Sequence, residues 1–502
     1  MKKKISDTIN KSLICFLKWK PPKLLIFTIL LIFILFVSIN CFRIDNDFWF
    51  LINLGKNILN NGFTRIEPFT IHNDFSFIIQ QWLSDVIFYI IYSKFGVYGM
   101  MIFLSILICI IVTLIYKLCM LASENNVKIS TTITIIITFL LNMYFITTRP
   151  QVFDILLLLC ELYLLELYVI KNNNLSLFLL PIVSLLMINL HSSLWLMLFV
   201  FLLPYFAEKI LLKSKYKLKP LIISTIIMLL VGLINPYGLD SIKYLFSSYG
   251  ITEINEAVAE MQPLTVTLAI GYYIITFLVF ISYYINKGDN KLRYLFLFLG
   301  TCYLGLSHYK GILFFLVGIV LSLSNNLNHL VKEEGIQEKY YKLKTSNLVI
   351  IIFMMCCVLL FGINLYSLNI NEYSKVELYD IANYLDDNAD KNIKLYTGYN
   401  VGGYLEYRGY KCYIDARAEV FLKANNKKED IFMEYYNLQK NQLNINSFLN
   451  KYNFDYLVVR SSDILYNYLE NSDDYIMVYE KIVEEECYRI YKKKVDNDYE
   501  IN

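Results

Sequence analysis

The chain has 502 residues, of which 57% are hydrophobic and only 18% are charged. This composition is too apolar for a water-soluble chain of that length, and it indicates a polytopic α-helical membrane protein. The formal net charge of +3 gives no sign of nucleic acid as a partner, so the positions of Lys and Arg matter more than their sum.

The apolar runs predict about eleven transmembrane helices, because a helix needs about 20 apolar residues to cross a bilayer. The first run follows a Lys-rich segment, residues 1–23, and the absence of an A-x-A site favours a retained anchor over a cleaved signal peptide. The expected spans begin at residues 24, 97, 129, 151, 175, 194, 219, 264, 291, 310 and 346.

The orientation of these spans follows from the basic loops between them. Loops such as "EKILLKSKYKLK" and "NKGDNKLR" fall on the same side as residues 1–23, which places the N-terminus in the cytoplasm. An odd number of spans then places the long loop 43–96 and the segment 370–502 on the extracytoplasmic side of the cell membrane. We therefore expect a cytoplasmic tail (1–23), a transmembrane domain (24–369) and an extracytoplasmic domain (370–502).

The first outer loop begins with "IDNDFWFLINLGKNILNNG", which places Asp45 and Asp47 where the first span ends. An amphipathic pattern follows and stops at Asn61-Gly62, so we expect a helix lying in the membrane interface with Trp49 at headgroup depth. The two carboxylates are compatible with a simple helix cap. At the lip of the bilayer, partial desolvation would also raise a carboxyl pKa and make a better proton acceptor.

Four cationic or titratable residues fall at predicted outer helix ends: Arg149, His191, His308 and Lys310. Groups of this kind in membrane proteins often mark functional sites and stabilise phosphate charge. Each could instead have a purely structural role. Arg149 could end a helix, Lys310 could extend its charged group to the membrane surface, and either histidine could be a hydrogen-bonded packing residue. Glu253, in the loop "ITEINEAVAEMQP", is placed to reach the same cavity or to face water.

The pattern changes after about residue 370, where short strand-like and amphipathic pieces alternate and predict a small α/β domain. Outside the cell, Cys412 and Cys487 are candidates for a disulfide. The amphipathic piece is "ELYDIANYLDD", and the strand-like pieces are "IKLYTG", "KCYIDA", "DYLVVR", "YIMVYE" and "CYRIYK".

Several of these stretches together resemble a known superfamily. The order D-x-D-x-W, a helix ending in Gly, "EPFT" and "QQWLSDVIFY" resembles the first outer loop of bacterial GT-C glycosyltransferases, which are related to the protein mannosyltransferases. Further along, "TTRPQ", "INLHSS", "LINPYG" and "YLEYRGYKCYIDAR" resemble a branch of that superfamily. Leu51 and Gln81 depart from the branch, which tends to have His and Glu there.

The resemblance implies a GT-C-like fold and a membrane enzyme that transfers a hexosyl or pentosyl group, with inversion, from a polyprenyl-phosphate donor. The acceptor would be a cell-envelope glycan, lipid or protein on the outer face. Asp47 would be the base, with Asp45 supporting it or binding Mg²⁺ or Mn²⁺. The substrate-binding residues implied are Arg149, His191, His308, Lys310, Trp49, Gln81, Trp82 and Glu253.

Other classes remain open from the sequence. No Walker motif or G-x-G-x-x-G is present, which argues against a nucleotide sugar or ATP as donor. A polytopic transporter or flippase would also carry a few charges among many spans, although its charges would be expected near the midplane. A glycan polymerase would be expected to use a large later loop, and a non-catalytic envelope assembly protein would not need Asp47.

Overall fold

The computed structural model describes residues 46–248, 270–286, 290–333, 378–483 and 486–494, together with the isolated positions 32, 42, 44, 261, 262 and 264. Asp45, Glu253 and the predicted spans that begin at residues 24 and 346 lie outside the described residues.

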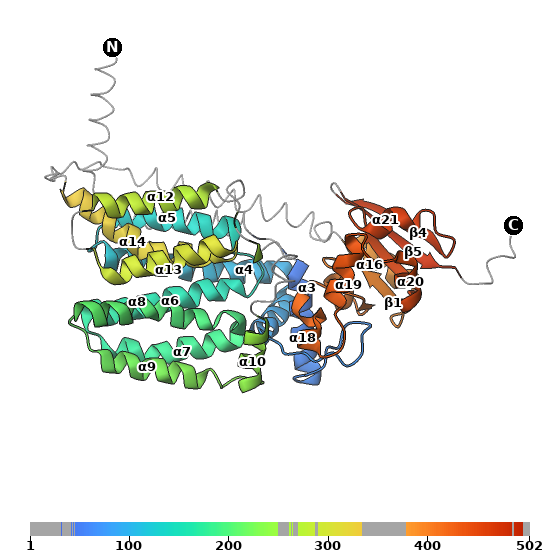
Figure 1. Ribbon diagram of the computed structural model, residues 1–502, viewed down its shortest axis with the longest axis horizontal. Helices are drawn as coiled ribbons and strands as arrows, with labels where there is room; N and C mark the ends of the chain where they lie inside the picture. Colours follow the sequence, from blue (N-terminus) through green and yellow to red (C-terminus); the bar gives the residue numbers. More distant parts are fainter. Residues whose placement is uncertain are drawn as a thin grey trace, which may run out of the picture.

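Nine apolar helices pack side by side in the described part of the chain, and they fall at the nine predicted spans that begin between residues 97 and 310 (Figure 1). Three segments are long and apolar enough to cross a membrane: Trp82–Ala122, Ser192–Leu212 and Gly311–Leu330. The count of eleven spans stays a prediction. The helices are α4 (Trp82–Ala122), α5 (Val127–Tyr144), α6 (Gln151–Lys171), α7 (Asn174–Leu190), α8 (Leu196–Leu212), α9 (Leu218–Val231), α12 (Ile270–Ile285), α13 (Leu292–Ser307) and α14 (Gly311–Glu333).

Helix α4 begins fifteen residues before the predicted span because it is bent rather than ended at Gly96. The backbone at Gly96 has φ 60° and ψ −153°, a conformation that glycine adopts at little cost. The bend separates the segment that starts at Trp82 from the long apolar part of the helix.

A buried ion network holds three of the bundle helices together, toward the C-terminal end of α6. Arg293 on α13 donates to Glu166 on α6 through Nε (2.7 Å) and to Glu208 on α8 through Nη1 (2.8 Å). All three side chains are almost fully buried. These charges satisfy one another, which explains how they are accommodated among apolar helices.

The first outer loop begins with helix α3 (Asn46–Asn61), which forms as the sequence predicts but is more enclosed than an interfacial helix. Most of its apolar residues, including Phe48 and Leu54, are buried, and the helix packs against α4 and the short helix α17 (Gly402–Tyr407). Trp49 is only 5% exposed, with its ring 4.7 Å from that of Tyr404. The amphipathic pattern therefore reflects a protein contact on this side.

The C-terminal residues form a five-stranded mixed sheet in the order β2-β1-β3-β5-β4. Strand β1 is parallel to β2 and β3, whereas β5 is antiparallel to β3 and β4. The described residues from 378 onward therefore combine helices and strands, as predicted for a small α/β domain. The strands are β1 (Lys394–Thr397), β2 (Lys411–Cys412), β3 (Tyr456–Arg460), β4 (Tyr475–Val483) and β5 (Glu486–Lys493); the other helices are α16 (Tyr379–Asn388), η3 (Ala418–Phe421), α18 (Lys423–Asn426), α19 (Ile431–Gln439), α20 (Ile445–Tyr452) and α21 (Ile464–Leu469).

The suggested disulfide does not form. Cys412 and Cys487 are both free thiols. They belong to β2 and β5, which β1 and β3 separate in the sheet, so their side chains cannot meet without taking the sheet apart.

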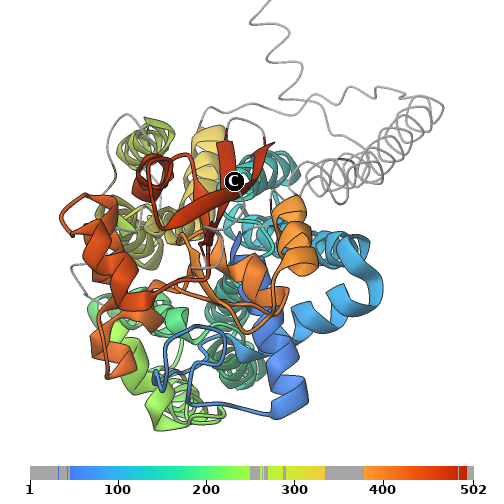
Figure 2. The same cartoon turned by 90° about the vertical axis from the view of Figure 1, so that its right-hand side faces the viewer.

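The C-terminal domain sits against one end of the helix bundle, where α3 and α10 (Leu239–Ser248) lie and where α18 of the domain contacts α10 (Figure 1). Figure 2 shows the same arrangement from the side of the sheet. The first outer loop pairs directly with this domain, because Cys412 donates to Phe69 O (3.3 Å) and accepts from Ile71 N (3.0 Å). Nε2 of His72 lies 2.8 Å from Tyr413 O. The loop is thus bonded at both backbone and side-chain level to residues more than 300 positions away.

Candidate functional site

Asp47 and Arg149 meet at the end of the bundle that faces the C-terminal domain. Asp47 lies in the first turn of α3, and Arg149 directly precedes Pro150 and α6. Nη2 of Arg149 lies 3.1 Å from Oδ2 of Asp47, and both side chains remain about one quarter exposed. Two residues chosen from separate motifs thus form one ion pair that ligands can reach.

A second acid and base lie on the adjoining helices. Asp154, in the first turn of α6, is fully buried, and its Oδ2 lies 2.5 Å from Nδ1 of His191, the residue that ends α7. The other oxygen of Asp154 has no hydrogen-bond partner among the described residues. Because α6 carries Asp154 and follows Arg149, the start of this one helix positions both pairs.

Lys310 and His308 occupy the turn between α13 and α14. The charge of Lys310 acts on Asp154 in the bundle and on Glu419 in the C-terminal domain. Burial, followed by the charge of Lys310, lowers the pKa of His308. His308 is therefore mainly neutral at pH 7 and suited to hydrogen bonding, while Lys310 supplies the charge.

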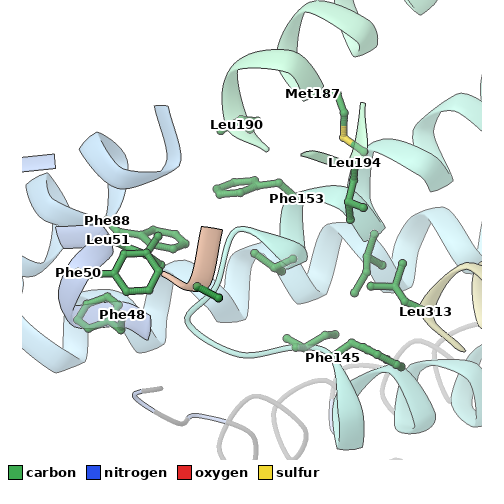
Figure 3. Packing of buried hydrophobic residues seen from close by; sticks show 14 of the residues in the cluster. Phe48, Phe50, Leu51, Phe88, Phe145, Phe153, Met187, Leu190, Leu194 and Leu313 are labelled. Atoms are coloured by element: carbon green, nitrogen blue, oxygen red, sulfur yellow. The ribbon is translucent and has the colours of Figure 1, made fainter. Parts of the chain in front are cut away.

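Buried apolar side chains, called here the apolar floor, pack next to these polar groups. Phe153 and Leu190 stand next to Asp154 and His191 in the chain, and both belong to one buried cluster that also contains Phe145, Leu194 and Leu313 (Figure 3). Side chains in a close-packed interior have few alternative positions. The floor therefore fixes the helix ends from which the charged residues project.

The motif "QQWLS" at the start of α4 meets the motif "INLHSS" at the end of α7. Nε1 of Trp82 donates to Asn189 Oδ1 (2.8 Å), and Ser192 N donates to Gln80 O (2.8 Å). Gln81 directly precedes α4 and is partly exposed. These contacts tie the segment that contains His191 to the first outer loop.

A buried charge cluster, formed by Glu67, Glu406, Asp415 and Arg417, joins "EPFT" to "YLEYRGYKCYIDAR". Arg417 is 1% exposed, and its Nη2 lies 2.9 Å from Glu67, with its Nε 2.9 Å from Asp415 Oδ2. Glu406 accepts more weakly, at 3.5 Å. Burial, together with Asp415, raises the pKa of Glu406 well above its usual range, so this carboxyl keeps a proton and reduces the excess of negative charge.

The C-terminal domain extends from this cluster over the site. Tyr399 donates to Ala416 O (2.6 Å). Burial, followed by the charge of Asp47, raises the pKa of Tyr399 well above its usual range. Glu419 is partly exposed, although its neighbours Ala418 and Val420 are buried. Residues of both domains therefore surround the same polar region.

No cluster of metal ligands stands out among the described residues, and a divalent cation at Asp45 and Asp47 stays a prediction. They contain no group of three or more His, Cys, Asp or Glu side chains placed to hold an ion. Mg²⁺ and Mn²⁺ need several oxygen ligands, whereas the oxygen that Asp47 would offer is bonded to a guanidinium. Asp45, the other proposed ligand, lies outside the described residues.

The sequence analysis named Asp47, Arg149, His191 and Lys310 as candidates, and their roles stay predictions; it did not name Asp154, which lies only five residues after Arg149. Its position on the fourth residue of an apolar run was the available signal, since a carboxylate inside such a run needs a partner. Trp49 lies in an aromatic cluster between α3, α4 and α17, and its predicted contact with substrate stays a prediction.

Comparison with known proteins shows the fold. No family model and no curated protein matches the chain. The crystal structure of the Archaeoglobus fulgidus oligosaccharyltransferase in its apo form matches with a TM-score of 0.53 and 12% identity, over 83% of this chain and 66% of that one. The same enzyme tethered with an acceptor peptide matches with a TM-score of 0.53 and 11% identity, over 86% and 68%. The chain thus shares its fold with the archaeal oligosaccharyltransferase and spans about two thirds of that enzyme's length.

Proposed function

We propose that this protein is a membrane glycosyltransferase that moves a sugar from a polyprenyl-phosphate donor to a hydroxyl group of a cell-envelope acceptor. The observation that carries the proposal is the Asp47–Arg149 ion pair, placed where the bundle meets the C-terminal domain. A fold shared with an oligosaccharyltransferase supports it, as does the resemblance of the surrounding motifs to GT-C enzymes.

Asp47 has the chemistry of the general base. Its side chain remains about one quarter exposed, so an acceptor hydroxyl can approach the carboxylate. In the proposed step the acceptor hydroxyl gives its proton to Asp47 while its oxygen bonds to the anomeric carbon. The bond from that carbon to the phosphate oxygen breaks, and the lipid phosphate leaves with the electron pair. Attack opposite the leaving group inverts the anomeric centre.

Arg149 and Lys310 have the charge needed by the leaving group, and His191 and His308 add hydrogen-bonding groups beside them. Negative charge grows on the phosphate as the sugar departs, and fixed cations in a region of low dielectric stabilise it strongly. The buried carboxylate of Asp154 holds His191 in position, with its Oδ2 2.5 Å from Nδ1 of the imidazole. No step of this scheme passes through a metal ion.

The proposal is tested in cells that lack the protein, by mass spectrometry of envelope glycans and lipid-linked sugars. We expect one lipid-phosphate sugar to accumulate and one envelope component to lose that sugar. Wild-type protein should restore both, and the Asp47→Asn variant should restore neither. Unchanged glycans and lipids would contradict the proposal. Recovery by Asp47→Asn would favour a transporter or an assembly protein, because neither needs the base.

Replacing Arg149 should weaken the use of donor in two graded steps. Arg149→Ala is expected to lower kcat/KM for the donor by about 10–100-fold, the cost of one charged hydrogen-bonding group. Arg149→Lys should recover only part, because the planar fork is lost while the charge is kept. Donor titrations of purified protein in lipid measure both. Arg65→Ala is the control, since Arg65 is 62% exposed and pairs with Asp240. If Arg149→Ala and wild type have the same kcat/KM for the donor, Arg149 does not bind the donor and serves only to end the segment before α6.

A further inference from the structure

The first outer loop and the C-terminal domain meet around the buried charge cluster, Glu67, Glu406, Asp415 and Arg417. Each of these residues is at most 4% exposed. Glu67 belongs to the loop, whereas the other three belong to the domain, on α17 and on the segment that follows β2. Three carboxyl groups thus share one guanidinium at the contact between two distant parts of the chain.

The three carboxyl groups of the cluster are not equally bonded. Glu67 accepts from Arg417 Nη2 (2.9 Å) and from the backbone nitrogen of Thr70 (2.9 Å), and Asp415 accepts from Arg417 Nε (2.9 Å). Glu406 is 3.5 Å from Arg417 Nη2, and its Oε1 has no hydrogen-bond partner among the described residues. Arg417 therefore stabilises the negative charge of Glu67 and Asp415 more than that of Glu406.

Glu406 is the residue of the cluster that is suited to hold a proton. It is hydrogen-bonded to Asp415, and two carboxyl groups form such a bond only if one of them is protonated. Burial, followed by the charge of Asp415, raises the pKa of Glu406 well above its usual range, and Glu67 adds to this effect while Arg417 opposes it. Loss of the proton leaves three buried carboxylates on one guanidinium, and an unbalanced buried charge is costly.

The elements around Glu406 bring other titratable residues to this region, but none of the described ones is a second cation bonded to Glu406. They are Cys412 on β2, Asp47 and Lys56 on α3, Asp85 on α4, Tyr404, Tyr407 and Arg408 at α17, and Glu419 on η3. Of the two cations among them, Lys56 is exposed and Arg408 pairs with Asp386. The proton on Glu406 is therefore what reduces the excess of negative charge.

Separation of the loop from the domain would change the surroundings of Glu406. Glu67 leaves with the loop and water reaches the carboxyl group, so its pKa returns toward that of an exposed glutamic acid, about 4.3. The docked form thus binds this proton more tightly than the separated form. The stabilisation that results is complete below the pKa of the separated form, and it is lost as the pH rises through the higher pKa of the docked form.

We propose that the contact between the first outer loop and the C-terminal domain is a proton-controlled latch, which is closed while Glu406 is protonated and loosens when this residue ionises. The latch concerns only the contact between loop and domain, so it does not depend on the proposed sugar transfer. Because the candidate site includes residues of both parts, the site is complete only in the closed form.

His72 belongs to the same contact and responds to pH in the opposite direction. Its Nε2 lies 2.8 Å from Tyr413 O, and burial lowers its pKa from the ordinary value of 6.5. The contribution of neutral His72 is therefore fully present above pH 6.5 and is lost as the pH falls through the lower pKa of the docked form. Only Glu406 loosens the contact as the pH rises. The carboxylates that act on His72 and oppose the shift are Glu67, Glu429 and Glu434.

Two backbone amides of the loop report the state of the latch. Ile71 N donates to Cys412 O (3.0 Å) and Ser76 N donates to Asn426 O (3.1 Å), so contact with the domain protects both from hydrogen exchange. Exchange is measured by mass spectrometry on the full chain in lipid bilayers, with the intrinsic pH dependence of exchange removed. As Glu406 ionises, each pH unit should lower this protection by up to about tenfold, the effect of one linked proton. The amides of β3 should stay protected, because the domain itself remains folded.

Glu406→Gln imitates the protonated residue, because the amide is neutral and still donates to Asp415. This variant should keep the protection of Ile71 and Ser76 nearly constant as the pH rises. Glu486→Gln is the control, since it makes the same change in a pair with Arg460 whose side chains are about one third exposed. The control should lose protection with pH as the wild type does.

Constant protection of Ile71 and Ser76 in the wild type, from neutral to alkaline pH, would overturn the latch. Loss of protection in Glu406→Gln with the wild-type pH dependence would also overturn it. If the amides of β3 are unprotected in Glu406→Gln, the domain has not folded and Glu67→Gln takes its place. Glu67→Gln lowers the negative charge around Glu406, so its total loss of protection should be smaller than in the wild type. An equal loss would overturn the latch.

Discussion

Asp47→Asn is expected to lower the rate of sugar transfer by about 10² or more, in line with the usual contribution of a general base. The amide has nearly the same size as the carboxylate and still hydrogen-bonds, so the protein should insert, fold and bind donor. Only proton acceptance is lost. Initial rates of purified protein in lipid, at saturating donor and acceptor, measure the effect.

The control for this variant is Asp74→Asn, which makes the same change in the same outer loop at an exposed position. The backbone of Asp74 has φ 59°, a conformation that asparagine also tolerates, so folding should not be affected. Both variants must be compared at equal amounts in the membrane, because a misfolded protein would imitate a catalytic defect. Transfer by Asp47→Asn at the wild-type rate would remove Asp47 from the reaction.

The same rate measurements distinguish the role of Asp45 from that of Asp47. Asp45→Asn should cost less than Asp47→Asn if Asp45 only supports the base. If Asp45 binds a cation, its variant should instead depend on added Mg²⁺ or Mn²⁺. An inactive Asp45→Asn beside an active Asp47→Asn would exchange the two roles.

Arg417→Met is expected to cost about 3–5 kcal/mol of the free energy that holds the C-terminal domain on the first outer loop. The methionine keeps much of the volume, but Glu67 and Asp415 lose the cation that their buried carboxylates require. Limited proteolysis of the loop in intact membranes, at increasing denaturant, measures this loss. The transfer rate should fall with it, because Tyr399 and Glu419 lie on the same domain.

Arg460→Met gives the comparison for Arg417→Met. Arg460 pairs with Glu486 at 2.9 Å, but the two side chains are about one third exposed. An exposed pair contributes only about 0–1 kcal/mol, so proteolysis should change little. Adding Glu67→Gln to Arg417→Met should restore part of the stability by removing one unpaired charge. Equal effects of Arg417→Met and Arg460→Met would show that the buried cluster does not hold the domains together.

The helices and strands could be predicted because each leaves a local pattern in the sequence. Apolar runs gave the bundle, and alternating pieces such as "DYLVVR" gave the sheet. The pairing of charges could not be predicted, because Glu67 and Arg417 are 350 residues apart and no local rule joins them. Asp47 and Arg149 were found singly, and only the fold makes them partners.

The surroundings of helix α3 were also beyond local reasoning. An apolar stripe has the same spacing whether it meets lipid or protein, so Phe48 and Leu54 could not report that α17 covers them. Asp154 was overlooked for a related reason: a carboxylate in an apolar run needs a partner, but its sequence does not say that the partner is His191, 37 residues later.

The bonds between the first outer loop and the C-terminal domain set an order of events during synthesis. His72 and Tyr413 are separated by 341 residues. At roughly 5–20 residues per second, the ribosome needs about 20–70 s to make the chain between them. Throughout that interval the loop that carries Asp47 is present without its covering domain. The candidate site is therefore completed only when the last part of the chain has been made, and a truncated product would lack the residues that the C-terminal domain contributes to it.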